Sequence, residues 1–227
     1  MVEKLKLLHK KQQQDNSLQE EEEEEKSLGR KVIPSIALTL SLISLLAASS
    51  SDLLEFSARN LAFHMTAEHL IFFATGALFV EVISRLLRPV RRLVMGLKMS
   101  HIVICLMISA AILAIWHYPL LFAAALFHEE LHQLQHASFI MTGAIAYTAL
   151  RSMSPSYLIL FCVLICGIMG LFGALLLVSN ELIFFPYSIE DHAEAGNTMI
   201  ILTIVVGVVL LPAILIRNSI WHELRQQ

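Results

Sequence analysis

Charged residues are scarce in this sequence. Asp, Glu, Lys and Arg make up 15% of its 227 residues, whereas 56% are hydrophobic and the mean hydropathy is +0.69. This composition excludes an ordinary soluble domain, which carries more polar surface. We therefore expect a membrane protein that contacts lipid and has no nucleic-acid partner.

Cysteines are also few, and several common catalytic motifs are missing. The three cysteines, Cys105, Cys162 and Cys166, all fall within apolar segments, so we expect no disulfide framework. The sequence contains no P-loop, dinucleotide-binding fingerprint, nucleophile elbow or CxxC pair. Their absence excludes the enzyme classes that these motifs mark, and we expect no enzymatic turnover.

Apolar runs long enough to cross a bilayer, which takes roughly 20 residues per helix, occur six times. They lie at about 32–50, 61–83, 100–117, 131–150, 157–179 and 196–216. The pattern predicts an all-α, polytopic membrane helical bundle with six transmembrane helices, which occupies residues 32–217. We predict that the polar residues 1–31 form a disordered, charged cytoplasmic tail without a cleavable signal peptide, and that residues 218–227 form a short cytoplasmic tail.

The positive charges are distributed unevenly around these segments. With both ends of the chain in the cytoplasm, 15 of the 16 Lys and Arg residues lie inside, and Arg59 lies outside. The positive-inside rule therefore predicts an N-in/C-in topology. We expect the protein to lie in the plasma membrane. We expect the basic loop around Arg88, Arg91 and Arg92 to contact anionic headgroups.

Histidines gather on the opposite side. Seven of the ten fall near the predicted outer ends of the segments. Neutral imidazole is the commonest protein ligand for transition metals, so this gathering predicts a metal site at the extracytoplasmic face. The seven are His64, His69, His117, His128, His132, His136 and His192.

The strongest ligand candidates open the fourth apolar run. His132 and His136 are four residues apart, a spacing at which two histidines on a helix can chelate one ion. His128 continues the same ridge, but it lies too far along the axis to share that ion and is treated as peripheral. The alternative is that these histidines bind water or lipid headgroups at the interface.

The second run opens with His64-Met65-Thr66-Ala67-Glu68-His69. Histidines five residues apart point about 140° away from each other on an ideal helix, so both can face one site only if the helix is bulged. Met65 and His69 share a face and would suit Cu(I). Glu68 shares a face with His64, where it could bind a harder ion or orient a ligating histidine; we take the orienting role for it.

The loop before the last run is rich in ionisable groups. Asp191 and His192 stand just before the start of a predicted helix. Acidic residues favour helix N-termini, so Asp191 could act as a cap. Equally, Asp191 and His192 could close a metal site or receive an incoming ion, and the sequence leaves both interpretations open.

Three blocks of the sequence are similar to a known family. Residues 116–126, WHYPLLFAAAL, resemble a W-H-x-P-x-L-Y-x-x-A-L signature, and residues 131–143, LHQLQHASFIMTG, resemble L-H-x-x-x-H-x-x-F-x-x-x-G. Asp191, Gly196 and Met199 resemble the pattern that opens the family's last helix. In this order the blocks resemble the bacterial membrane family of CtaG-type cytochrome c oxidase assembly factors, and a related archaeal membrane family. The resemblance runs from about residue 60 to 215.

The resemblance implies an integral membrane factor that serves a haem–copper oxidase by handling copper. The chain departs from the family in two places. The bacterial members have H-M-x-x-H in the early helix, whereas His64 and His69 are five apart, so that either Met65 or a helix bulge would take over the missing role. The family's aspartate is followed by Gln, whereas Asp191 is followed by His192, which could add a ligand.

The leading hypothesis is therefore a metal-binding assembly factor for a haem–copper terminal oxidase. Copper would be held by His132, His136 and His69 with His64 or Met65, while His117, His192 and Asp191 would assist its entry or release, and oxidase subunits would be the partners. The alternatives are a haem b-binding electron carrier with one axial histidine from each of two helices, a small-ion permease, and an accessory subunit of a respiratory complex. The oligomeric state is not predicted.

Overall fold

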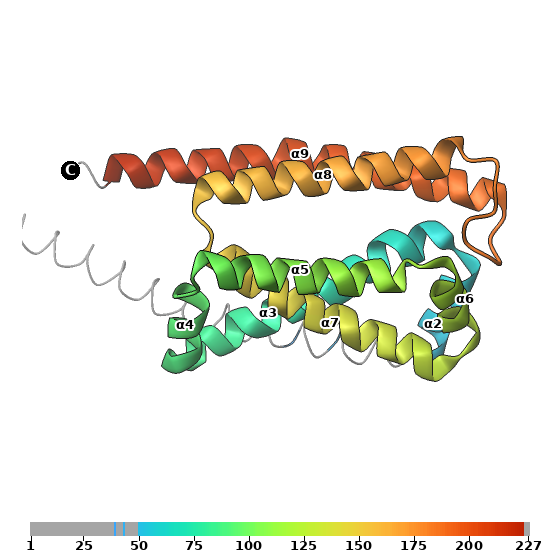
Figure 1. The fold of residues 1–227 in the computed structure, drawn as a ribbon, viewed down its shortest axis with the longest axis horizontal. Helices are drawn as coiled ribbons and strands as arrows, with labels where there is room; N and C mark the ends of the chain where they lie inside the picture. Colours follow the sequence, from blue (N-terminus) through green and yellow to red (C-terminus); the bar gives the residue numbers. More distant parts are fainter. Residues whose placement is uncertain (1–38, 40–42, 44–49, 225–227) are drawn as a thin grey trace, which may run out of the picture.

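Helices make up nearly all of the described chain (Figure 1). The computed structural model describes residues 50–224 together with Thr39 and Ile43, and it contains no strand among them. The elements are α2 (Ser51–Arg59), the π-helix η1 (Phe63–Glu68), α3 (His69–Leu86), α4 (Arg88–Met95), α5 (Met99–Trp116), α6 (Pro119–Phe127), α7 (Glu129–Ser152), α8 (Pro155–Val178) and α9 (Ile189–Leu224). The predicted all-α class is therefore confirmed for this part of the chain.

Four of the described helical segments are long and apolar enough to cross a bilayer: Phe63–Leu86, Met99–Trp116, Pro155–Val178 and Ile189–Val209. They overlap four of the six predicted spans and indicate a membrane protein. The predicted tail 1–31 lies outside the described residues, as does most of the predicted span 32–50. The described helices thus support four spans, while the count of six and the N-in/C-in orientation stay predictions. At the other end, α9 continues as a helix to Leu224, past the predicted boundary at 217.

The predicted span 131–150 is a helix of sufficient length, α7, but its composition is more polar than that of the four apolar segments. The reason is that one face of α7 is buried against other helices. It packs against both α3 and α5, and its buried residues include histidine, glutamine and threonine. A helix that faces protein rather than lipid does not need a uniformly apolar surface.

Two glycines bring α3 and α7 into close contact. A Cβ atom on Gly76 would lie 1.8 Å from the carbonyl oxygen of Ile140, and one on Gly143 would lie 2.0 Å from that of Phe73. Any side chain at these positions would push the two backbones apart, because real Cβ atoms do not approach so closely. Small residues thus set the helix separation, as in other membrane helix pairs.

The last two helices, α8 and α9, form an antiparallel pair beside the α3–α5–α7 group (Figure 1). Gly173 and Gly196 allow the two backbones to approach closely, since a Cβ on Gly196 would lie 2.5 Å from the oxygen of Gly173. Large apolar side chains on α8 face outward; Ile168, Leu171 and Val178 are 63%, 74% and 73% exposed. Such a surface suits lipid rather than water.

The two groups of helices meet at one end of the molecule. An apolar cluster there joins Leu61 and Met65 to Phe122 of α6, Leu176 of α8 and Phe184 of the connecting loop. Helix α6 was not predicted; its nine residues are too few for a span, and it begins with Pro119, which is favourable in a first helical turn. In Figure 1, α6 and the 179–188 loop lie at one end of the bundle, and α4 lies at the other.

Candidate metal centre

The π-helix η1 explains how two histidines five residues apart can face one site. A π-helix closes i→i+5 hydrogen bonds and so places one more residue in each turn than an α-helix does. His64 and His69 consequently approach each other, with ring centroids 5.1 Å apart. The helix bulge, which the sequence left as one of two possibilities, is present at Phe63–Glu68.

Local side chains stabilise this turn. The side-chain oxygen of Asn60 accepts a hydrogen bond from the N–H of Phe63, at 2.7 Å, which satisfies a donor at the helix start. The hydroxyl of Thr66 donates to the carbonyl oxygen of Ala62. Back-bonding of this kind competes with the regular α-helical ladder and commonly distorts it.

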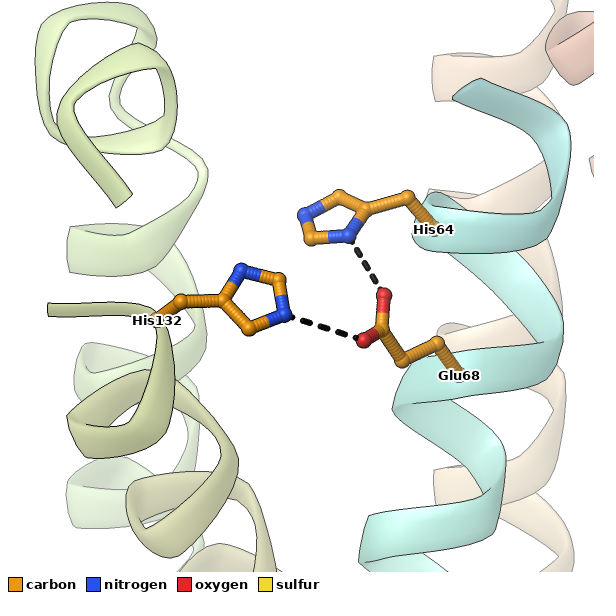
Figure 2. Close-up of side chains that lie close together, drawn as sticks. All are labelled: His64, Glu68 and His132. Atoms are coloured by element: carbon orange, nitrogen blue, oxygen red, sulfur yellow. Dashed lines mark hydrogen bonds and ion pairs between the residues drawn. The ribbon is translucent and has the colours of Figure 1, made fainter. Parts of the chain in front are cut away.

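Glu68 lies at the centre of the site: it is the last residue of η1, and its carboxylate points toward α7 (Figure 2). Its Oε2 accepts a hydrogen bond from His64 Nδ1 at 2.5 Å. Its Oε1 accepts from His136 Nε2 at 2.6 Å and from His132 Nε2 at 3.2 Å. We call Glu68, His64, His132 and His136 the Glu68 cluster. The exposed fraction of each of these four side chains is 2% or less.

The hydrogen bonds make this burial possible. A carboxylate removed from water is costly unless donors surround it, and here three imidazole N–H groups do so. Some imidazole nitrogens nevertheless lack a partner. His64 Nε2, His132 Nδ1 and His69 Nε2 are buried with no hydrogen-bond partner among the described residues. Buried polar atoms are rarely left in this state unless a water or an ion completes them.

The donor set fits a metal ion. Ligand atoms of His64, Glu68 and His132 lie within 4.8 Å of one another, and His136 reaches the same carboxylate oxygen as His132. Imidazole and carboxylate together suit zinc, copper or iron. The orienting role predicted for Glu68 stays a prediction; its carboxylate contacts all three histidines and is also close enough to their ring nitrogens to be counted among the ligand atoms.

Phenylalanine rings enclose the site. Phe122 packs edge-on against His64 with ring centroids 4.7 Å apart, Phe72 lies 4.1 Å from His136, and Phe139 lies 4.2 Å from His69. All three rings are essentially buried. They exclude water and strengthen the electrostatic contacts inside. The sequence analysis did not predict this layer of rings. Phe139 follows His136 by three residues, a spacing that places both on one helix face, and this was a usable signal.

Two further predicted ligands lie beside the Glu68 cluster. The ring of His69 is next to that of His64 and 5.3 Å from that of His117. His117 donates from Nδ1 to the carbonyl oxygen of Leu113 at 2.7 Å, which fixes its tautomer. These two rings extend the histidine array from the cluster toward α5, at whose end His117 lies.

The remaining three predicted residues have other contacts. Met65 packs in the apolar cluster with Leu61 and Phe122. Asp191 accepts a hydrogen bond from the backbone N–H of Ser188 at 2.8 Å, and the Ser188 hydroxyl accepts one from the N–H of Asp191 at 3.1 Å. This reciprocal pair caps the start of α9.

His192 uses both ring nitrogens in contacts with the backbone. Its Nδ1 donates to the carbonyl oxygen of Ser188 at 2.6 Å, and its Nε2 accepts from the N–H of Phe184 at 2.9 Å. No nitrogen is left for a metal in this arrangement. Nearby, the hydroxyl of Tyr187 donates to the carbonyl oxygen of Ser57 at 2.6 Å. Burial, together with the negative charges of Glu68 and Asp191, raises the pKa of Tyr187, which keeps this donor protonated.

Sequence reasoning also missed Gln135. It lies on α7 between His132 and His136, is fully buried, and has no hydrogen-bond partner for either side-chain amide atom among the described residues. Buried amides are rarely left without a partner, and this one lies three residues after His132 on the same helix.

Comparisons with known proteins confirm the resemblance to the assembly-factor family. A family model described as cytochrome c oxidase caa3 assembly factor (Caa3_CtaG) matches residues 82–219. The matched range contains His117, His132 and His136, whereas His64 and Glu68 on η1 precede it. No curated protein and no solved structure matches the chain.

Proposed function

The chain belongs to the family of cytochrome c oxidase caa3 assembly factors, and from this premise we propose that it binds an exchangeable copper ion at the Glu68 cluster while a haem–copper oxidase is assembled. The protein would be an integral, multi-pass protein of the plasma membrane, with the metal site toward the extracytoplasmic face. It would deliver or hold metal without catalysing a reaction. The observation that carries the proposal is a buried carboxylate contacted by three histidines, some of whose other ring nitrogens have no partner.

The cluster has the chemistry that an exchangeable site needs. Without an ion, imidazole N–H groups satisfy Glu68, so the empty site does not leave a bare buried charge. An incoming ion would displace one or more of these protons, because imidazole must be deprotonated at the ligating nitrogen. Histidine N–H groups and a metal ion thus offer alternative ways to satisfy the same carboxylate, which favours reversible loading.

The donor types favour a divalent ion. Imidazole and carboxylate ligands bind Cu²⁺ more tightly than Zn²⁺ or Fe²⁺ when geometry permits. The soft sulfur of Met65, which would favour Cu(I), is packed in the apolar cluster instead. We therefore propose Cu²⁺ as the preferred ion. A haem would require the Glu68 carboxylate, which bridges His64 and His132 (Figure 2), to leave its position.

The test is metal content of the full chain, purified in mild detergent without a His-tag and exposed to copper. Elemental mass spectrometry should find about one copper per chain. The double variant His132→Ala/His136→Ala should lose it, and His128→Ala, an exposed histidine at the start of the same helix, should retain it. Iron with a Soret absorption band would support the haem alternative, and absence of any metal after loading would overturn the proposal.

The assembly role needs a cellular test. Deleting the gene in the source organism should lower haem–copper oxidase activity in membranes, and the unaltered chain should restore it. The double variant His132→Ala/His136→Ala should not restore activity if copper handling is the function. Restoration by that variant, at normal protein levels, would separate the assembly role from metal binding and contradict the proposed mechanism.

A further inference from the structure

A basic pocket lies at the end of the bundle opposite the Glu68 cluster. It has a volume of about 660 Å³ and is formed where α3, α4 and α7 meet. Arg85 of α3, Arg91 of α4 and Arg151 of α7 contribute to its wall, together with Glu81, Val94 and Met95. Three arginines from three different helices therefore converge on one space.

Glu81 orients this pocket without neutralising it. Its Oε1 accepts from Arg85 Nε at 2.6 Å and from Arg85 Nη2 at 2.5 Å, and its Oε2 accepts from the hydroxyl of Tyr147. Arg151 Nε is 4.0 Å from Oε2, at the outer limit of an ion pair. Three guanidinium groups against one carboxylate leave an excess of two positive charges.

Arg91 accounts for part of this excess. No ion pair between Arg91 and an acidic residue is present in the part of the chain that the structure describes. Guanidinium groups stay charged at any physiological pH and present forked donors that match phosphate oxygens. The pocket therefore has the chemistry of a phosphate-binding site.

Exposed apolar side chains lie on the same short helix as Arg91. Leu87, Leu93 and Met95 are 52%, 63% and 56% exposed, and they lie on or next to α4, which runs across the end of the bundle (Figure 1). The hydroxyl of Ser152 donates to the carbonyl oxygen of Val94, which ties α4 to α7. An exposed apolar and basic helix of this kind suits the boundary between headgroups and acyl chains.

We propose that this pocket binds the phosphate group of an anionic phospholipid, with the apolar residues of α4 beside its acyl chains. The basic groups select the phosphate, and the neighbouring leucines and methionine favour a lipid over a free phosphate ion. The site is independent of the Glu68 cluster, because it lies at the other end of α3 and shares no residue with it.

The experiment uses the full chain in detergent, titrated with phosphatidylglycerol or phosphatidylcholine and analysed by native mass spectrometry. Phosphatidylglycerol should be retained preferentially. The double variant Arg91→Gln/Arg151→Gln should weaken its binding on the order of tenfold or more, and Arg92→Gln, an exposed arginine of α4 outside the pocket, should change it less than about twofold.

Two outcomes would overturn the proposal. One is that the unaltered chain retains the two lipids equally, or that the double variant retains phosphatidylglycerol as well as the unaltered chain does. The other is displacement of the bound lipid by millimolar inorganic phosphate, which would identify a free-anion site instead. Copper content measured on the same variants should be unchanged, so a failure here is distinguishable from a failure of the proposed function.

Discussion

Glu68 and Glu81 lie near the two ends of α3, about 20 Å apart at 1.5 Å per residue, and α7 supplies partners to both. Glu68 is fully buried and meets the imidazoles of His132 and His136, whereas the side chain of Glu81 is 19% exposed and meets Tyr147 and the guanidinium of Arg85. The two carboxylates thus differ mainly in what surrounds them.

This difference decides what each end can bind. An imidazole can lose the proton that it donates and offer the lone pair to a metal, but a guanidinium cannot, because its pKa is above about 12. The histidine end is therefore suited to a cation that replaces protons. The arginine end keeps its positive charge and is suited to an anion. Helix α7 contributes to both sites, and so does the continuous helical segment Phe63–Leu86, which comprises η1 and α3.

Exchanging each carboxylate for its amide should produce the largest contrast. Glu68→Gln removes the only negatively charged member of the Glu68 cluster, and copper affinity, measured by competition with a chelator, should fall on the order of 100-fold or more. Glu81→Gln should leave copper affinity within about twofold, because it lies at the other end of the helix. Equal copper affinity in Glu68→Gln and the unaltered chain would show that the carboxylate is not a ligand.

Much of the fold was accessible from sequence because bilayer thickness fixes helix length. The runs predicted at 100–117 and 157–179 correspond closely to α5 (Met99–Trp116) and α8 (Pro155–Val178). Helix α6 was missed, since a short apolar segment between two longer ones carries no length signal. The burial of polar residues on one face of α7 likewise depends on the helices that pack against it, and a hydropathy profile does not show which helices those are.

The site was predictable in location and less so in detail. Charge asymmetry and histidine position placed the candidate ligands at one end. The central place of Glu68 could not be predicted, because it depends on the π turn and on the approach of α7. The contacts of His192 could not be predicted either, because its partners are backbone atoms of a folded loop. Sequence shows which side chains could ligate, but not which nitrogens are already occupied.

The close packing of α3 on α7 should couple the two ends. Gly143→Ala places a Cβ atom 2.0 Å from the carbonyl oxygen of Phe73, so the helices must separate at a cost of about 3 kcal/mol. We expect a lower melting temperature in detergent. We also expect weaker binding of both copper and phosphatidylglycerol, since each site uses α7 and the continuous helical segment Phe63–Leu86 to which α3 belongs. Single changes at Glu68 or Arg91 should affect only one ligand.

Gly167→Ala is the matched control for this change. Gly167 is also a helical glycine, but a Cβ there would meet nothing within 4 Å. Its melting temperature and both binding affinities should match those of the unaltered chain. If Gly143→Ala were equally harmless, the α3–α7 contact would not be what holds the two sites together, and their common helix pair would be incidental.

The smallest expected effect separates a structural histidine from a ligating one. His192→Ala removes the acceptor of the Phe184 N–H and the donor to the Ser188 oxygen, and burying these unsatisfied groups should cost about 2 kcal/mol. Thermal unfolding in detergent should show this loss while copper per chain stays near one. The opposite pattern, stability retained and copper lost, would make His192 a ligand. That result would require its ring to leave two backbone contacts, and it would extend the metal site from η1 and α7 to α9.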